Sequence, residues 1–383
     1  MRVMLFTDTL GDVNGVSRFV DNMSRAALVS EKPFPDQPLV VVTSTRFEVP
    51  RRANILNVRP ALSMPMPGYP QLQLALPPVL ALRRAFREFK PDVVHVSTPG
   101  LVGLVGLALA RSAEIPVVGV YHTDFPAYVD HLFENDSLTS LTSFLMSVVY
   151  RRFARVVTRS DDYAKRLVTL GLDLARLSTL RPGLDLEMFH PRFRAPSVWS
   201  ALGIDPFTPK VLYVGRVSVE KNLSFLVQVW KSLGVNASLV VVGDGPYRAT
   251  MERELAGTNT IFLGFRHGAE LSTLYASSDI FVFPSTTDTL GQVVLEAQAS
   301  GLPVLVSDRG GPCGVVRDGA TGLVIPAVDL AAWAVSLREL LNDPGRRHAM
   351  GHAAAQWAAS MPIRVCWENF LEIHYQALRA RDD

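Results

Sequence analysis

Short apolar runs recur along the chain, and each is followed by a polar loop and a segment with helical periodicity. Runs of four or five apolar residues are typical of strands buried on both faces of a parallel sheet. Their alternation with helices predicts an α/β fold. The alternation begins at residues 3–6, stops at residues 191–209, which we interpret as a linker, and restarts at residues 211–214. Since domains usually hold about 100–200 residues, a chain of 383 is expected to form two of them.

The stretch 281–297 shows this pattern with the most chemical detail. Its apolar run ends in a polar turn, and a helix is predicted after the turn. Thr289 and Gln292 have the spacing of a capping box, so the helix is expected to begin at Leu290. The first amides of a helix have no partner inside it, and those of residues 290–292 would point at the turn. They predict an anion site, and Gly291 leaves room for close approach.

Two carboxylates bracket this predicted anion site. Asp288 precedes the helix, and Glu296 lies about two turns along it, roughly 10 Å away at ~1.5 Å per residue. This separation suits a ligand with hydroxyl groups at both ends and a charged centre. Glu296 is suited to accept hydrogen bonds from both hydroxyls of a ribose, and Asp288 to hold sugar hydroxyls. The alternative is a capped helix with Asp288 as an N-terminal charge and Glu296 in solvent.

Cationic or glycine-containing loops follow other predicted strands. Arg216 and Lys221 follow the first strand of the second domain, where they could neutralise a leaving diphosphate; the alternative is two surface cations. Gly243 lies in the loop after the next strand. Gly15 stands at a helix start and can present amides to a phosphate, unless its loop is a plain βα turn. His122 ends a strand, where open α/β sheets bind ligands, although a lone histidine is as often structural.

The composition argues against several classes of site. The formal net charge of +2 gives no reason to expect a nucleic-acid partner. Cys313 and Cys366 have neither metal-binding nor disulfide spacing, which favours a reduced, cytoplasmic setting. No Asp, Glu or His cluster has metal-ligand spacing, so cations and helix amides would replace a metal as electrophile. No apolar stretch reaches membrane-spanning length and no signal peptide is evident, so any membrane contact would be peripheral.

The first half of the chain is slightly basic. Residues 1–190 carry 21 Lys and Arg against 18 Asp and Glu, which fits contact with an anionic surface. Three arginines lie in the predicted helix 79–89, and an amphipathic helix is predicted at 138–150. The latter is either an interfacial, acceptor-side helix or a core helix with a solvated basic end. Residues 65–70 contain three prolines and predict a rigid loop.

Several of these segments match one enzyme family. Gly215 and Arg216 with residues 220–222 resemble its diphosphate-binding segment, and residues 288–296 resemble its E-x7-E motif. Further matches lie at Gly15, 122–124, 183–185, Phe189, 243–246, 262–264 and 295–303. On these residues the chain resembles the retaining, GT-B-fold nucleotide-sugar glycosyltransferases of family 4, over nearly its whole length.

The resemblance implies a domain plan. Two Rossmann-like β/α domains would face each other across a cleft and close on each other. Residues 1–190 would bind the acceptor and residues 191–361 the nucleotide-sugar donor. A helix at 362–383 would cross back to the first domain.

The resemblance also implies a reaction. A hexose would pass from an NDP-sugar, of the GDP-mannose or UDP-glucose type, to an acceptor hydroxyl with retention, giving an α-glycoside without a metal or other cofactor. No protein nucleophile is expected at the anomeric carbon. The implied catalytic residues are Arg216, Lys221, Asp288 and His122. The implied donor-binding residues are Gly15, Gly243, Leu290, Gly291, Gln292 and Glu296.

The sequence departs from the family pattern at two positions. Asp288 replaces the first glutamate of the motif, and Gly314 stands where an acidic residue is expected. Residues 65–70 and 287–289 resemble members that glycosylate lipids, including mannosyl-, glucosyl- and sulfoquinovosyl-lipid synthases. This subgroup implies a lipid or glycan acceptor and a place on the inner face of the cell membrane. The alternatives are a nucleotide-sugar epimerase of the same fold and a non-enzymatic two-domain sugar-binding protein, which would need an export signal.

Overall fold

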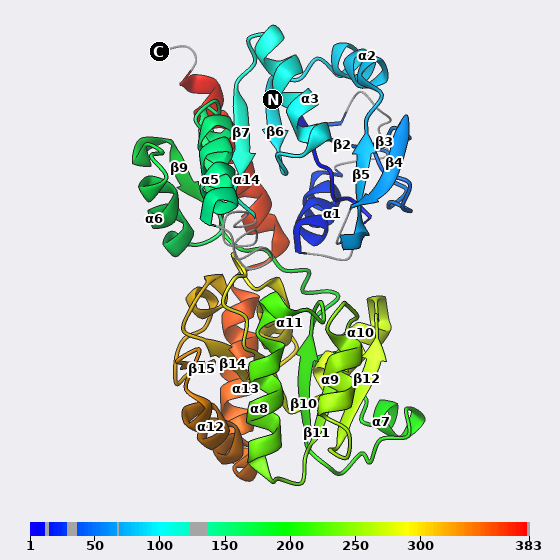
Figure 1. Cartoon of the computed structure of the whole chain (residues 1–383), viewed down its shortest axis with the longest axis vertical. Helices are drawn as coiled ribbons and strands as arrows, with labels where there is room; N and C mark the ends of the chain where they lie inside the picture. The colour runs from blue at the N-terminus through cyan, green and yellow to red at the C-terminus, as the bar shows by residue number, and fades with distance from the viewer. Residues whose placement is uncertain (12–14, 29–36, 67–68, 123–135, 381–383) are drawn as a thin grey trace. The chain divides into compact units, whose positions relative to one another are not determined.

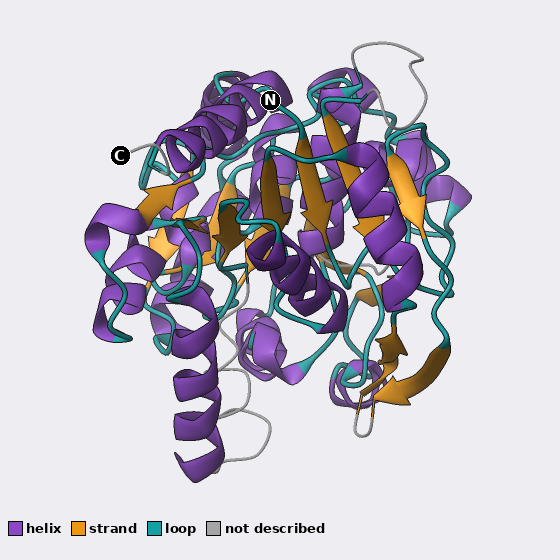
Figure 2. Cartoon of the chain, turned by 90° about the horizontal axis from the view of Figure 1, so that it is seen from above, coloured by secondary structure: helices purple, strands orange, loops and turns teal. Residues whose placement is uncertain are grey.

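The computed structural model describes residues 1–11, 15–28, 37–66, 69–122 and 136–380. It divides into two units, each described by itself below. Unit 1 comprises Met1–Gly183 and Ile363–Asp383, and unit 2 comprises Leu184–Pro362. Figure 1 labels the elements of each unit, and Figure 2 shows strands in orange covered by helices in purple. Both units have the predicted α/β class with a parallel sheet.

Unit 1 is built on a sheet of seven strands within its described residues, in the order β3-β2-β1-β6-β7-β8-β9. All neighbouring strands in it are parallel. Chain order reverses at β1, between β2 and β6, and such a switch point is where open α/β sheets bind ligands. The strands are β1 (Val3–Phe6), β2 (Leu39–Thr43), β3 (Ile55–Asn57), β6 (Val93–Val96), β7 (Val117–Val120), β8 (Arg155–Thr158) and β9 (Leu177–Thr179).

Helices cover both faces of this sheet. Alternate residues of a strand point to opposite faces, so Val3 and Leu5 pack in one core cluster and Met4 and Phe6 in another. The first cluster is covered by α1 (Gly15–Ala27) and α14 (Ile363–Arg379), which contact each other. The second involves α2 (Val79–Phe89), α3 (Leu101–Ser112), α5 (Asp136–Tyr150) and α6 (Asp161–Thr169). The last helix of the chain therefore packs in unit 1.

The predicted rigid loop at residues 65–70 is wrong. β4 (Leu62–Met66) and β5 (Tyr69–Leu76) form a separate antiparallel pair that includes Pro65 and Pro70, with Leu62 opposite Leu76. A two-stranded sheet has a free edge on each strand, and a proline, which lacks an amide hydrogen, is tolerated at such an edge. Residues 67–68 lie outside the described residues.

Unit 2 is built on a sheet of six strands within the residues described there, in the order β12-β11-β10-β13-β14-β15. Its neighbouring strands are also parallel. β10 lies between β11 and β13, so the switch point of this unit falls between β10 and β13. The strands are β10 (Lys210–Val214), β11 (Ser238–Val242), β12 (Thr260–Gly264), β13 (Ile280–Phe283), β14 (Val304–Ser307) and β15 (Gly322–Ile325).

The helices of unit 2 enclose one large apolar cluster around this sheet. They are α7 (Ser197–Ala201), α8 (Leu223–Leu233), α9 (Arg248–Glu254), α10 (Gly268–Ser277), α11 (Gln292–Ala299), α12 (Leu330–Asn342) and α13 (Pro344–Ala359). Single 3₁₀ turns occur at Pro191–Phe193, Val219–Lys221 and Gly311–Val315.

Residues 191–209 are not the predicted linker. They hold α7, and the ring of Trp199 is buried, with Nε1 donating a hydrogen bond to the carbonyl of Ser277 at 2.9 Å. The segment packs because its apolar side chains complete the core beside α10, a contact that its local sequence does not reveal.

Candidate active site

The loops after β10 and β13 meet at the switch point of unit 2. The two strands are direct neighbours, so Arg216 and Lys221, which follow β10, lie beside the turn after β13. The hydroxyl of Thr287 in that turn donates to the carbonyl of Glu220 at 3.1 Å. The hydroxyl of the buried Tyr213 donates to the carbonyl of Arg216 at 2.9 Å and so fixes the start of the cationic loop.

Lys221 and Asp288 form an ion pair. The Lys221 Nζ lies 2.8 Å from Oδ1 and 2.9 Å from Oδ2 of Asp288. The two residues are 67 positions apart, and about one fifth of each side chain is exposed. Sequence reasoning assigned them to different parts of a ligand and did not predict that they contact each other. The position of each charge in the site therefore depends on the other.

The predicted start of the helix after β13 is wrong. α11 begins at Gln292, with Gly291 as its N-cap, and not at Leu290. Gly291 has φ 76°, a left-handed backbone that L residues rarely adopt. An added Cβ there would lie 2.9 Å from Cγ of Pro312, so the group that comes close to this glycine is a proline.

Leu290 therefore lies in the turn before the helix, and its side chain is buried. The next loop holds this turn, because the amide of Gly311 donates to the carbonyl of Asp288 at 2.7 Å. A Cβ on Gly311 would lie 2.0 Å from the carbonyl oxygen of Thr289, so only glycine fits. The first helical amides belong to Gln292 and the residues after it. These amides form the positive end of the helix dipole, which favours anions.

Glu296 is buried within α11, with 2% of its surface exposed. The alternative that placed it in solvent is wrong. The hydroxyl of Tyr275, a buried residue of α10, lies 3.3 Å from its Oε2. No motif pointed to Tyr275, whose role follows only from the packing of α10 against α11. A buried carboxylate with one such donor can accept further hydrogen bonds.

Gly243 shapes the same edge of the sheet. Its φ is 132°, and an added Cβ would lie 1.9 Å from the carbonyl oxygen of Gly215. Its amide donates to the carbonyl of Gly264 at 2.8 Å. The amide of Gly215 donates to the carbonyl of Val242 at 3.0 Å. Three glycine-containing loops thus pack backbone against backbone beside Arg216.

Two predicted site residues lie in unit 1. Gly15 is exposed at the start of α1, and Asn14 before it lies outside the described residues. His122 follows β7 and is part-buried, with its ring centre 4.8 Å from that of Phe19. Burial lowers its pKa well below the usual value, and the nearby Arg159 lowers it further, so the imidazole is neutral at pH 7. Residues 123–124, matched to the family motif, lie outside the described residues.

Asp8 was missed by sequence reasoning, although an acidic residue two positions after β1 is a usable signal. Its Oδ1 accepts from the amide of Val102 at 2.8 Å, and its Oδ2 from the hydroxyl of Thr98 at 2.9 Å. Burial raises its pKa, and these hydrogen bonds limit the rise. The N-terminus of α3 is therefore already neutralised by a carboxylate of the protein.

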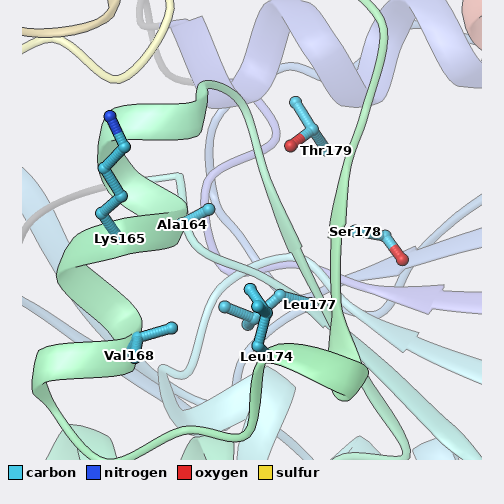
Figure 3. A pocket seen from close by; sticks show the side chains of 7 residues that line it. All are labelled: Ala164, Lys165, Val168, Leu174, Leu177, Ser178 and Thr179. Carbon is cyan, nitrogen blue, oxygen red and sulfur yellow. The ribbon is translucent and has the colours of Figure 1, made fainter.

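Other features of the described residues bear on the site. They contain no group of three or more His, Cys, Asp or Glu that could hold a metal ion. Both cysteines are free thiols. None of the helices in the described part of the chain is long and apolar enough to cross a membrane. A pocket of about 500 Å³ beside α6 is lined by Leu174, Leu177 and five neighbours and contains none of the predicted site residues (Figure 3).

Comparisons with known proteins identify the family of this chain. Residues 200–357 match the family described as Glycosyl transferases group 1, and residues 13–188 match Glycosyltransferase Family 4. The sulfoquinovosyl transferase SQD2 of Arabidopsis thaliana is 34% identical over 88% of this chain and 67% of its own length. A GDP-mannose-dependent alpha-mannosyltransferase of Mycobacterium tuberculosis is 32% identical over 100% of this chain and 98% of its own.

Solved structures show the same fold. The Anabaena protein Alr3699/HepE, in complex with UDP and glucose, has a TM-score of 0.77 at 17% identity, covering 97% of this chain and 99% of its own. A sucrose-phosphate synthase of Thermosynechococcus elongatus has a TM-score of 0.76 at 16% identity, covering 99% and 100%. From the family matches, the relatives above 30% identity and the shared fold, we conclude that the chain belongs to the group 1, family 4 glycosyltransferases, GT-B enzymes that use nucleotide-sugar donors with retention.

Proposed function

We propose that the protein transfers a hexose from a donor of the GDP-mannose or UDP-glucose type to a hydroxyl of a membrane lipid or glycolipid, forming an α-glycoside. The observation that carries this proposal is the meeting of Arg216, Lys221 and Asp288 with the start of α11 at one switch point. Relatives support the donor and acceptor classes. They include the mannosyl- and sulfoquinovosyltransferases above and an alpha-monoglucosyldiacylglycerol synthase of Streptococcus pneumoniae at 26% identity.

In this proposal the unit 2 residues act on the donor. Arg216, Lys221 and the first amides of α11 stabilise the departing diphosphate as its negative charge develops. Glu296 accepts the ribose hydroxyls, and Asp288 holds the sugar. Gly243 lets its loop pack against the backbone of Gly215, which positions the loop that carries Arg216. The leaving phosphate helps to remove the acceptor proton, and no protein nucleophile takes part.

In this proposal the unit 1 residues His122 and Gly15 bind a sugar hydroxyl and a donor phosphate, respectively. A neutral imidazole at His122 can exchange hydrogen bonds with a sugar hydroxyl without adding charge. Gly15, exposed at the start of α1, presents its amide to a donor phosphate.

The proposal is tested by incubating the protein with a panel of NDP-sugars, with and without a lipid extract, and measuring NDP release. Release that depends on the lipid and on one donor, with an α-linked hexose on the product, is the expected result. An epimerised donor without any acceptor would favour the epimerase. Binding of free sugar that NDP does not affect would favour a sugar-binding protein.

The same assay tests the expected independence of metal. Since Arg216, Lys221 and helix amides are proposed as the electrophiles, EDTA should leave turnover unchanged. A loss of activity with EDTA that Mg²⁺ or Mn²⁺ restores would assign the diphosphate to a metal instead.

We further propose that unit 1 contacts an anionic membrane through α2. Leu80 of this helix is 81% exposed, and Arg83, Arg84 and Arg87 are exposed on the same side at the i+3, i+4 and i+7 positions. An apolar residue flanked by cations suits insertion beside anionic headgroups.

This contact is measured by co-sedimentation with vesicles that contain or lack an anionic lipid. Replacing Arg83, Arg84 and Arg87 by Gln should abolish binding to the anionic vesicles. The matched control replaces Lys231, Arg253 and Arg346, three exposed cations of unit 2, and should bind as the unaltered protein does. Equal losses in both triple variants would reject α2 as the contact.

A further inference from the structure

A group of buried polar side chains lies on the face of the unit 1 sheet that α1 and α14 cover. His95 of β6 and His374 of α14 are hydrogen-bonded, with Nδ1 of His95 2.9 Å from Nε2 of His374. Nδ1 of His374 lies 2.6 Å from the carbonyl of Phe370, so it donates there, and Nε2 must accept from His95. Burial lowers the pKa of both imidazoles, which are therefore neutral near pH 7, and Nε2 of His95 is buried without a hydrogen-bond partner within the described residues.

Arg159 belongs to the same group, and it carries a positive charge that also lacks a partner. It follows β8 directly and is 5% exposed. Its guanidinium carbon lies 4.8 Å from the centre of the Phe19 ring. Its Nη1 is buried and has no hydrogen-bond partner within the described residues.

None of the described groups that face this guanidinium supplies a negative charge. They are Phe19 of α1, His122 after β7 and Cys366 of α14. Burial raises the pKa of the Cys366 thiol, so this thiol is neutral near pH 7. Burial and the charge of Arg159 lower the pKa of His122, so this ring is neutral too. A buried guanidinium without a counter-charge is costly, and a buried donor without an acceptor adds to the cost.

The location of Arg159 favours a ligand as the missing partner. Arg159 and His122 stand at the carboxyl ends of the neighbouring strands β8 and β7, the edge at which open α/β sheets bind ligands. Gly15, where α1 begins, lies one helical turn before Phe19, so the positive end of that helix is near. Only 5% of the surface of Arg159 is exposed, so a group that pairs with it must be small and terminal rather than a whole sugar.

We propose that Arg159, with His122 beside it, forms a subsite for an oxyanion, namely a phosphate, sulfonate or carboxylate group carried by one of the substrates. A guanidinium pairs with two oxygens of such a group at once, and the neutral imidazole can donate to a third. Whether the group belongs to the donor sugar or to the acceptor rests on the proposed function; the presence of the subsite does not.

The subsite is tested by binding of methyl phosphate and methanesulfonate, measured as a rise in the unfolding midpoint over sodium chloride of equal ionic strength. Three proteins are compared: the unaltered chain, Arg159→Gln and Arg152→Gln, which removes an exposed arginine of the same unit. We expect a saturable rise in the first and third and none in Arg159→Gln. Arg159→Gln without ligand should be at least as stable as the unaltered chain, because an uncompensated charge is gone.

A second variant separates loss of anion binding from a change in folding. Arg159→Lys keeps the charge but loses the planar fork, so the same rise should need a roughly tenfold higher anion concentration. Equal anion responses in all four proteins would overturn the proposal, since they would report only a general effect of salt. An unliganded Arg159→Gln protein that is strongly destabilised would show that the guanidinium serves the fold.

Turnover then separates the two sources of the oxyanion. NDP-sugars with and without an anionic group on the sugar are compared, as are acceptors with and without a phosphate. Arg159→Gln should raise KM for the anionic member of one pair only, and that pair identifies the substrate that carries the group. If no donor supports turnover while the anion-dependent rise persists, the proposed function fails and the subsite stands.

Discussion

Lys221 and Asp288 hold each other, and this contact ties the charge of the cationic loop to the turn after β13. Because each side chain is only about one fifth exposed, breaking the pair should cost more unfolding free energy than the roughly 0–1 kcal/mol of a surface ion pair. Catalysis should also fall. Lys221→Met removes a cation from the departing diphosphate and should lower kcat by roughly 10²–10³-fold.

Asp288→Asn tests the other partner of the pair. NDP affinity, measured by calorimetry, should persist while turnover falls, because this carboxylate is assigned to the sugar. The matched controls are Arg266→Met and Glu270→Gln, which break a surface ion pair of 2.7 Å in the same unit and should leave turnover unchanged. Intact NDP binding with unchanged turnover in Asp288→Asn would remove this residue from the site.

Glu296 allows a test of the proposed contact between its carboxylate and the ribose of the donor. Glu296→Gln keeps the shape but removes the charge that is proposed to accept both ribose hydroxyls. Hydrogen bonds to a charged group contribute about 1.5–3 kcal/mol, so the Kd for NDP should rise by roughly 10- to 100-fold. Inorganic diphosphate, which has no ribose, should bind as before. Equal weakening of both ligands would place Glu296 in a structural role, and Glu270→Gln serves as the exposed control.

At the scale of elements, the start of α11 depends on Gly291 in two ways. Its left-handed backbone strains any L residue, by about 1–2 kcal/mol. A Cβ there also meets Pro312 at 2.9 Å, and such overpacking costs about 1–3 kcal/mol more. Gly203 has a similar φ of 73° but nothing within 4 Å of an added Cβ, so Gly203→Ala isolates the first effect.

Urea unfolding of the two variants separates these effects. Gly291→Ala should lose more unfolding free energy than Gly203→Ala, and only Gly291→Ala should weaken NDP binding, because it displaces the first amides of α11. Equal losses in the two variants would mean that Pro312 yields without cost and that the helix start tolerates a side chain.

Elements were predictable from sequence where local pattern decides them. The apolar run at 211–214 gives β10, and that at 281–283 gives β13, because four or five buried residues in a row suit a parallel strand. The start of α11 was misplaced because the turn before it contains the left-handed Gly291 and is held by a hydrogen bond from Gly311, about twenty residues later. Residues 191–209 were assigned to a linker because the partner of Trp199, the carbonyl of Ser277, is 78 positions away.

The candidate site divides in the same way. Arg216, Lys221 and Asp288 were identified from residue type and spacing. Their mutual contact could not be, since it needs β10 and β13 to be neighbours in a sheet whose order only the tertiary fold fixes. The hydrogen bond from Tyr275 to Glu296 has no local signal either, because it joins two helices.

At the scale of the whole molecule, the two units concentrate different kinds of charge. Unit 2 places cations, carboxylates and helix amides at its switch point. Unit 1 buries neutral histidines beside a charged arginine. The stability of unit 1 should therefore depend on pH in the range in which histidines titrate. None of the residues assigned to the site of unit 2 is a histidine.

The histidine pair in unit 1 determines whether the free energy of unfolding rises or falls with pH. An imidazole in the unfolded chain has a pKa near 6.5. Burial lowers the pKa of His374 to about 4, against a small opposing effect of the Phe370 carbonyl, and lowers that of His95 well below its usual value. Between these pH values the unfolded chain binds protons that the folded chain does not. The free energy of unfolding is therefore undiminished above about pH 6.5 and falls as the pH falls toward 4.

His374→Gln should reduce this dependence. The amide can still donate to Phe370 and accept from His95, but it does not titrate, so the loss between pH 7 and pH 4 should shrink by about 3 kcal/mol. Urea unfolding at several pH values measures this loss of unfolding free energy. Pulsed deuterium labelling at one fixed pH reports the unfolding of α14. His352→Gln, which replaces an exposed histidine of unit 2, should behave as the unaltered protein does. The same pH dependence in His374→Gln as in the unaltered chain would show that the buried pair is already protonated in the folded state.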